Sequence, residues 1–192
     1  MSDLAAVILA AGAGTRLGGV AKALLPARRG GGVFLDRIAA TARAAGTSTL
    51  LVVVGPPFGA EVAAHAGALG ASIVENPAPE RGMASSIALG FAALLETACA
   101  RAWLWPVDHP EIAISTLELL AAALGDHAAA RPTVNGRGGH PPLIARALWP
   151  ALAACDAQPR GARDVLAAAD VVSIEVADAG CLRDVDTPED LA

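Results

Sequence analysis

The sequence predicts an α/β fold in three layers, with helices on both faces of a mostly parallel central sheet. Short apolar runs alternate along the chain with segments of helical periodicity, which is the order typical of such proteins. The runs are continuously apolar, as expected of strands that are buried on both faces. With 192 residues and no linker or repeat, we expect a single domain over residues 1–192 that carries a small hairpin insertion.

The individual elements follow from local patterns. The predicted strands comprise residues 4–9, 50–54, 72–75, 102–107 and 171–176. The predicted helices have apolar residues three and four positions apart and comprise residues 34–45, 59–69, 83–98, 115–124, 147–154 and 161–169. Extended segments at 132–135 and 142–144 flank a Gly-Arg-Gly-Gly run and predict the hairpin. A strand at 182–185 is expected next, and then a helix with Thr187 as N-cap and Pro188 at its first position.

The composition excludes several classes of protein. Hydrophobic residues make up 54% of the chain and charged residues 17%, which excludes a disordered chain. No apolar run approaches the roughly 18 residues of a membrane-spanning helix. A net charge of −5 gives no basic footprint for nucleic acid. The three cysteines lie far apart without metal-ligand spacing, and no signal peptide precedes the first strand, so we expect a cytoplasmic protein without disulfides or zinc.

The first candidate site is the glycine-rich loop that follows the first strand. Its residues are Leu9, Ala10, Ala11, Gly12, Ala13 and Gly14, followed by the cations Arg16 and Lys22. The loop lies at the carboxyl ends of the predicted strands, where open α/β sheets bind ligands and backbone N–H groups can converge on phosphate oxygens. Leu17 replaces the third glycine of the dinucleotide fingerprint, and no Gly-Lys-Ser/Thr completes a P-loop. The remaining alternative is a turn without a ligand.

Two aspartates are candidate metal ligands. Asp108 follows the fourth strand at the same edge of the sheet, and Asp186 precedes the last helix start. Mg²⁺ prefers one or two carboxylates together with substrate phosphates and water. The structural alternatives are a turn residue before Pro110 for Asp108 and a helix cap for Asp186.

Three weaker signals complete the candidate site. Gly82, Met83, Ser85 and Ser86 open a long helix and are typical either of a helix start or of nucleotide contacts. His140 lies in the expected hairpin. Cations at Arg160 and Arg163 would be unfavourable for the start of a helix by itself, and they are better explained by an anionic substrate.

Together, these segments resemble the MobA-like nucleotidyltransferases. The sequence L-A-A-G-A-G-T-R-L-G-G with a later Lys resembles the family's signature loop, and V-D-H-P and D-V-D-T-P resemble its two metal motifs. The resemblance implies a Rossmann-like nucleotidyltransferase fold, in which Arg16, Lys22 and Asp108 are catalytic and Asp108 and Asp186 hold Mg²⁺. It implies nucleotide contacts from Leu9, Ala10, Ala11, Gly12, Ala13, Gly14, Arg16, Lys22, Gly82, Met83, Ser85 and Ser86.

Within this family the chain resembles the molybdenum cofactor cytidylyltransferases most. It shares their Ala-Ala-Gly loop, Gly-Met-x-Ser-Ser run, Gly-His-Pro and Gly-Ala-Arg. The resemblance implies CTP as donor, a molybdopterin acceptor contacted by His140, Arg160 and Arg163, and a molybdoenzyme or its chaperone as partner. His109 replaces the usual Gln, and the Asp of Gly-Asp-x-Gly-Ala-Arg is missing. Both departures fall on the acceptor side. Another acceptor, GTP as donor, a non-catalytic nucleotide-binding module and an NAD(P)-dependent oxidoreductase remain as alternatives.

Overall fold

A computed structural model describes residues 3–28 and 31–191 of the chain. Its centre is a mixed sheet with the strand order β3-β2-β1-β4-β7-β5-β6, in which β8 pairs with β5 on a separate branch. The strands are β1 Leu4–Leu9, β2 Thr49–Val54, β3 Ser72–Glu75, β4 Arg101–Pro106, β5 Ala129–Val134, β6 Arg137–Gly138, β7 Leu143–Ala145 and β8 Val171–Glu175. The first four strands are parallel, whereas β7 runs antiparallel to both β4 and β5.

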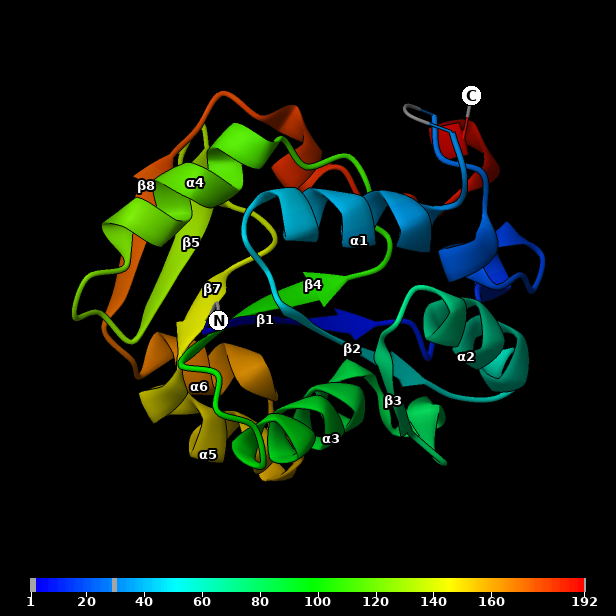
Figure 1. Ribbon diagram of the computed structural model, residues 1–192, viewed down its shortest axis with the longest axis horizontal. Helices are drawn as coiled ribbons and strands as arrows, with labels where there is room; N and C mark the ends of the chain where they lie inside the picture. The colour runs from blue at the N-terminus through cyan, green and yellow to red at the C-terminus, as the bar shows by residue number, and fades with distance from the viewer. Residues whose placement is uncertain (1–2, 29–30, 192) are drawn as a thin grey trace.

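Helices cover both faces of the sheet, as Figure 1 shows. They are α1 Phe34–Ala44, α2 Gly59–Ala68, α3 Met83–Leu95, α4 Ile114–Ala123, α5 Trp149–Ala153 and α6 Ala162–Ala167. Helices α1, α2 and α4 bury their apolar residues in one core, and α3, α5 and α6 bury theirs in another. The predicted three-layer α/β/α fold with a mostly parallel sheet is confirmed.

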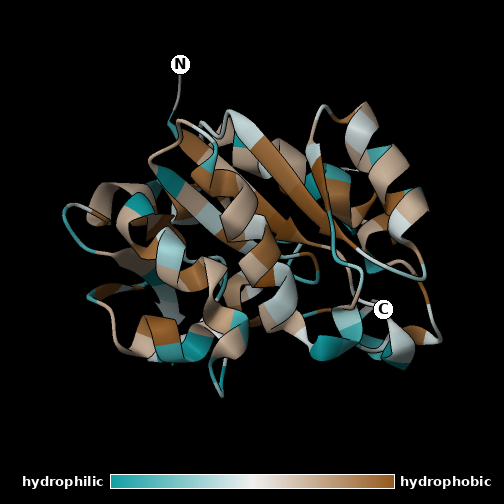
Figure 2. Cartoon of the chain, turned by 90° about the horizontal axis from the view of Figure 1, so that it is seen from below, coloured by the Kyte–Doolittle hydropathy of each residue, from teal (hydrophilic) through white to brown (hydrophobic). Residues whose placement is uncertain are grey.

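The alternation of side chains along the strands builds the two cores. In β1, Leu4, Ala6 and Ile8 face one core, while Ala5 and Val7 face the other. All of them are buried, which explains why the run is continuously apolar. In Figure 2 the central strands are accordingly the most hydrophobic part of the chain, and hydrophilic residues lie mainly on the outer helices and loops.

Some expected elements differ from those observed. Helix α3 ends at Leu95 and not at residue 98, and the helix expected at 147–154 is a 3₁₀ turn followed by α5. The hairpin consists of β5 and β6 around a turn with Asn135 in the left-handed region. The second segment expected for that hairpin, 142–144, instead contributes to β7, which lies inside the main sheet between β4 and β5.

The C-terminal segment is the other difference. Residues 182–185 form no strand: Arg183 is extended where the chain leaves the 3₁₀ helix Ala179–Leu182, but these residues join no ladder of the sheet. A backbone bond of 2.9 Å from Val185 N–H to the Asp108 carbonyl ties this segment to the loop after β4. The expected final helix is the 3₁₀ helix Pro188–Leu191. Before it, the hydroxyl of Thr187 donates to the carboxylate of Asp190, 3.0 Å away.

Within the described ranges 3–28 and 31–191, no helix combines the length and the apolar character needed to span a bilayer.

The close packing of α3 on the sheet gives a first prediction. A Cβ at Gly90 would lie 2.5 Å from Cγ1 of Val7 and 3.1 Å from Cγ2 of Val53. We therefore expect Gly90→Ala to lower the free energy of unfolding by about 1–3 kcal/mol through overpacking. Chemical denaturation monitored by circular dichroism measures the change.

The matched control is Gly67→Ala in α2, where a Cβ would meet no atom within 4 Å. This change should stabilise the protein by about 0.5–1 kcal/mol, because Ala restricts the unfolded chain more than Gly does. Equal effects of the two substitutions would contradict the packing argument.

Candidate active site

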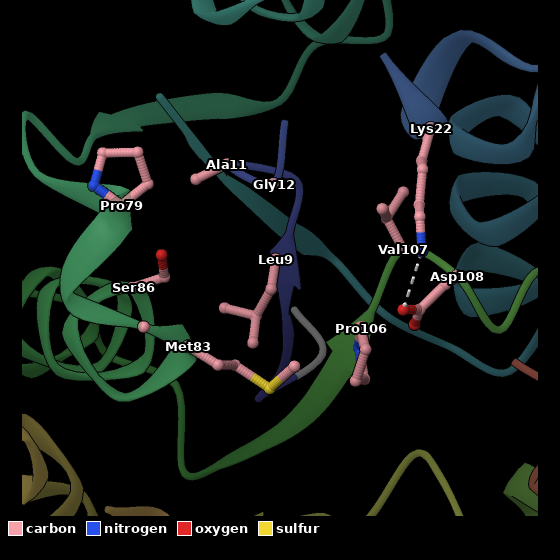
Figure 3. Close-up of a pocket in the computed structure, with 11 residues that line it drawn as sticks. Leu9, Ala11, Gly12, Lys22, Pro79, Met83, Ser86, Pro106, Val107 and Asp108 are labelled. Atoms are coloured by element: carbon pink, nitrogen blue, oxygen red, sulfur yellow. Dashed lines mark ion pairs between the residues drawn. The ribbon is translucent and has the colours of Figure 1, made fainter. Parts of the chain in front are cut away.

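A cavity of about 250 Å³ opens at the carboxyl ends of β1 and β4 (Figure 3). Its floor is the end of β1, the start of α3 lies on one side, and Lys22 and Asp108 lie on the other. The lining residues are Leu9, Ala11, Gly12, Lys22, Pro79, Gly82, Met83, Ser86, Pro106, Val107 and Asp108. Eight of these residues belong to the site expected from the sequence. The topology brings them together because parallel strands end at a common edge.

The glycine-rich loop folds back on itself beside this cavity. Gly14 has φ 57°, and its carbonyl accepts hydrogen bonds from the N–H groups of Leu17 and Gly19. A Cβ at Gly14 would lie 2.1 Å from the carbonyl oxygen of Val20, so only glycine fits there. Ala10, in contrast, donates its N–H to the Val53 carbonyl at 2.8 Å and continues the sheet pairing.

A second, shallower cavity of about 190 Å³ adjoins the loop. It is lined by Gly14, Thr15, Arg16, Lys22 and Asp186. Lys22 lines both cavities, so its positive charge lies next to the glycine-rich loop, the first cavity and the C-terminal segment that contains Asp186.

The ammonium group of Lys22 lies between Asp108 and Asp186, the two candidate metal ligands. It donates a hydrogen bond to Oδ1 of Asp186 and lies 3.6 Å from Oδ2 of Asp108. The guanidinium of Arg16 contacts the other oxygen of Asp186 at 2.6 Å. The side chain of Lys22 is only 14% exposed, whereas that of Arg16 is 74% exposed. The stronger of the two contacts is therefore the one with Lys22, since solvent screens Arg16.

These cations change the titration of Asp186. The hydrogen bond from Lys22 and the positive charges of Lys22 and Arg16 hold the pKa of the Asp186 carboxyl below its usual value, and partial burial opposes this shift. Asp186 is consequently ionised throughout the neutral range.

The aspartates fit a divalent cation. Oδ1 of Asp108 is buried and has no hydrogen-bond partner among the described residues, so one carboxylate oxygen is available for a ligand. No group of three or more His, Cys, Asp or Glu side chains that could hold a metal occurs within the described ranges. Two carboxylates completed by substrate phosphates and water are the donor set that Mg²⁺ prefers.

The expected acceptor residues separate in space. His140 and Arg163 line a cavity of about 610 Å³, together with Arg131 and residues of α6. Arg160 is not among its lining residues. Its guanidinium pairs with Asp164 at 2.6 Å, and its backbone N–H donates to the same carboxylate, so Arg160 binds the first turn of α6.

His140, which lines this cavity, stacks on His109, and His109 lies beside the carboxylate of Asp108. The rings of His109 and His140 stack with centroids 4.9 Å apart, and Nε2 of His109 lies 3.9 Å from Oδ1 of Asp108. Burial, with the nearby charges of His109 and Arg163, lowers the pKa of His140 to about 4. His140 is therefore neutral at pH 7. The Nδ1 atoms of both rings are buried without a hydrogen-bond partner among the described residues.

Sequence reasoning missed four residues around the nucleotide-side cavity. Pro79, Pro106 and Val107 line it, and Asn76 lies behind it and donates its amide hydrogens to Ser85 and Ser86. The Asn-Pro pair by itself signals a turn, and it does not indicate that Asn76 is only 2% exposed and hydrogen-bonded to both serines.

The fold and the site define a class of protein. A glycine-rich loop beside a lysine that lies between two carboxylates suits a nucleoside triphosphate with a divalent cation, as in the α/β nucleotidyltransferases. A family model described as MobA-like NTP transferase domain matches residues 6–173. The chain therefore belongs to the MobA-like NTP transferase family. No curated protein matches it in sequence comparison.

Solved structures share the fold of this chain. Rv0371c from Mycobacterium tuberculosis H37Rv is 26% identical with a TM-score of 0.80 over 99% of this chain and 95% of that one. A manganese complex of Rv0371c is 23% identical, with a TM-score of 0.74 over 98% and 95% of the two chains. The molybdopterin-guanine dinucleotide biosynthesis protein A from Archaeoglobus fulgidus is 17% identical, with a TM-score of 0.68 over 97% and 94%. A CMP:2-keto-3-deoxy-manno-octonic acid synthetase complexed with CTP is 16% identical, with a TM-score of 0.74 over 99% and 95%.

The ion pairs of Asp186 predict a pH dependence of stability. The folded-state pKa lies below the ordinary value of 3.8, so the stabilisation is fully present above that pH and is lost as the pH falls through the folded pKa. We expect the difference in unfolding free energy between wild type and Asp186→Asn to be constant above about pH 5 and to shrink below about pH 4. Urea denaturation from pH 7 to pH 2.5 measures it.

The control for this series is Asp126→Asn. Asp126 is exposed and takes part in no ion pair within the described residues, so its difference from wild type should stay small at every pH. A difference for Asp186→Asn that persists unchanged to pH 2.5 would contradict the role of the ion pairs.

Proposed function

We propose that residues 1–192 act as one Mg²⁺-dependent nucleotidyltransferase domain that transfers CMP from CTP to a molybdopterin acceptor and releases pyrophosphate. One observation carries this proposal: the ammonium of Lys22 lies between Asp108 and Asp186 at the rim of a cavity that the glycine-rich loop and α3 complete. Three segments distant in sequence thus meet at one edge of the sheet, and we assign phosphate binding and metal binding to them.

The nucleotide half of the site has clear chemical roles. Backbone N–H groups of Gly12, Ala13 and Gly14 bind the triphosphate, and the start of α3 with Met83 and Ser86 borders the base and ribose. Arg16 and Lys22 neutralise the charge that develops on the phosphates. The remaining expected contacts, Leu9, Ala10, Ala11, Gly82 and Ser85, shape or support this cavity.

In the reaction, a phosphate oxygen of the acceptor forms a bond to the α-phosphorus of CTP. The bond from the α-phosphorus to the oxygen shared with the β-phosphate breaks, and pyrophosphate leaves with the electron pair. Such chemistry needs positioning and charge stabilisation more than a protein nucleophile. Asp108 and Asp186 would hold Mg²⁺, which supplies electrostatic stabilisation of the phosphate charge when it is bound. The acceptor phosphate is ionised at neutral pH, so no general base is required.

The acceptor binds on the side of His140 and Arg163. Their cavity of about 610 Å³ has a cationic wall suited to a phosphorylated small molecule. A molybdoenzyme or its chaperone would then receive the product. Because Arg160 pairs with Asp164, we assign the charged contact with the acceptor to Arg163.

The structural neighbours support the proposed metal and donor. One of them is a manganese complex, and another is complexed with CTP. A neighbour named for molybdopterin-guanine dinucleotide biosynthesis keeps GTP as the alternative donor, and a phosphosugar or phospho-alcohol remains the alternative acceptor.

Calorimetric binding of CTP, GTP, ATP, UTP and NAD, with and without Mg²⁺, tests the nucleotide half. We expect CTP to bind most tightly, Mg²⁺ to strengthen its binding, and Asp108→Ala to abolish the Mg²⁺ effect.

In turnover assays, Asp108→Ala and Lys22→Ala should each lower kcat about 100-fold or more, as removal of one preorganised electrostatic contact does. Arg16→Lys should also lose activity, since a point charge does not replace a bidentate guanidinium. Binding of NAD alone, or of no nucleotide, would contradict the proposal.

The acceptor half has its own test in two arginines of the same segment. Arg163→Gln should raise the KM for the acceptor about tenfold or more with little change in the KM for CTP, because a charged hydrogen bond to phosphate is lost. Arg160→Gln serves as the control, since its guanidinium already pairs with Asp164. Steady-state kinetics with molybdopterin measure both variants, and a larger effect at Arg160 would overturn the assignment.

A further inference from the structure

A buried asparagine controls the hydrogen bonding of the cavity wall formed by α3. Asn76 follows β3 and is 2% exposed. Its Nδ2 lies 2.9 Å from Oγ of Ser85 and 2.9 Å from Oγ of Ser86. Its Oδ1 accepts a hydrogen bond of 3.0 Å from the N–H of Ala78.

The orientation of this amide is fixed by its neighbours. A backbone N–H can only donate, so the atom of the Asn76 amide that faces Ala78 must be the oxygen. The NH₂ group therefore points to the two serines, and each serine oxygen receives one of its hydrogens.

The two serines differ in where their own protons go. Ser85 donates to the carbonyl of Gly82 at 2.8 Å, so its proton is used within the helix start. Ser86 donates to no atom of the described residues, although its oxygen already accepts from Asn76. Ser86 lines the cavity, on the same side as Pro79 and Met83 (Figure 3). Its proton is thus the one hydrogen of this three-residue network that is available to a ligand.

We propose that Asn76 is a positioning residue for nucleoside recognition, because it holds the hydroxyl of Ser86 as a hydrogen-bond donor directed at an acceptor atom of the bound nucleoside. The inference rests on the proposed function, since it assumes that a nucleotide occupies this cavity. The recognised group is an oxygen or an unprotonated ring nitrogen of the base, or an oxygen of the ribose. Asn76 has no need to touch the ligand itself.

Ser86 can donate to the ligand because residue 76 carries an amide, whose NH₂ group donates to the oxygen of Ser86, and not an acid. An ionised carboxylate only accepts, so Asn76→Asp would draw the protons of both serines toward residue 76. Ser86 would then remain in place but present lone pairs to the ligand in place of a proton. Asn76→Leu removes the amide without adding a charge and leaves the Ser86 proton without a fixed direction.

The experiment is a double-mutant cycle read by calorimetry in the presence of Mg²⁺. Wild type is first titrated with CTP, GTP, ATP and UTP, and the nucleotide that binds most tightly is used thereafter. Asn76→Asp, Asn76→Leu, Ser86→Ala and the double variant Asn76→Asp/Ser86→Ala are compared with this nucleotide, its 2′-deoxy form and tripolyphosphate. Asn135→Asp is the matched control, because it makes the same chemical change in the β5–β6 turn, away from the cavity.

We expect Asn76→Asp and Ser86→Ala each to weaken nucleotide binding about three- to tenfold, the value of one neutral hydrogen bond. Tripolyphosphate binding should not change in Ser86→Ala or Asn76→Leu, which add no charge, and the loss in the double variant should be smaller than the sum of the losses in its two single variants. Asn76→Leu should act in the same direction, and it replaces Asn76→Asp if thermal denaturation shows that the acid variant does not fold. A loss that disappears with the 2′-deoxy nucleotide assigns the contact to the ribose, and a loss that persists assigns it to the base or the remaining ribose oxygens.

Three results would overturn the inference. They are wild-type nucleotide affinity in both Asn76 variants, losses from Asn76→Asp and Ser86→Ala that add fully in the double variant, and a loss of tripolyphosphate binding in Asn76→Leu or Ser86→Ala that equals the loss of nucleotide binding. In each of them wild type still binds a nucleotide, so the proposed function stands. If wild type binds none of the four nucleotides, the proposed function fails and this inference fails with it.

Discussion

The rest of the site depends on the ion pairs that the ammonium of Lys22 forms with Asp108 and Asp186. Lys22 is the only lysine in the sequence, and its side chain is 14% exposed. A cation removed from water to this extent requires opposite charges close by. Asp108 and Asp186 supply them, and Asp186 comes from a segment 164 residues further along the chain. The ion pairs, together with the bond from Val185 N–H to the Asp108 carbonyl, hold the C-terminal segment against the glycine-rich loop.

This arrangement means that the site balances its own charge without a ligand. The cations that suit phosphates, Lys22 and Arg16, are bound by a carboxylate that suits a metal, Asp186. In the proposed reaction, the triphosphate would replace Asp186 as the negative partner of Lys22 and Arg16. The divalent cation would replace these two side chains as the positive partner of Asp186. Within the part of the chain that the structure describes, Oδ1 of Asp108 has no hydrogen-bond partner, and it lies 3.9 Å from Nε2 of His109.

A reversal of strand direction explains why His140 lies close to this centre. β4 ends at the carboxyl edge of the sheet, and β7 runs antiparallel to it, so the residues just before β7 return to the same edge. His140 precedes β7 and stacks on His109, which follows β4. A wholly parallel sheet would place the residues before a strand at the opposite edge. The position of His140 beside His109 therefore depends on the direction of β7.

The sequence by itself determined the layers, the strands β1 to β4, the glycine-rich loop and the place of Asp108 after β4, because these depend on local periodicity and on the common edge of parallel strands. It could not determine the pairing of β7, the separation of Arg163 from Arg160, or the place of Asn76. Each of these depends on side chains or strands that meet only after folding. The orientation of a buried amide in particular is set by the donors and acceptors around it. The Ala78 N–H and the two serine hydroxyls fix that of Asn76, and they meet it only in the folded chain.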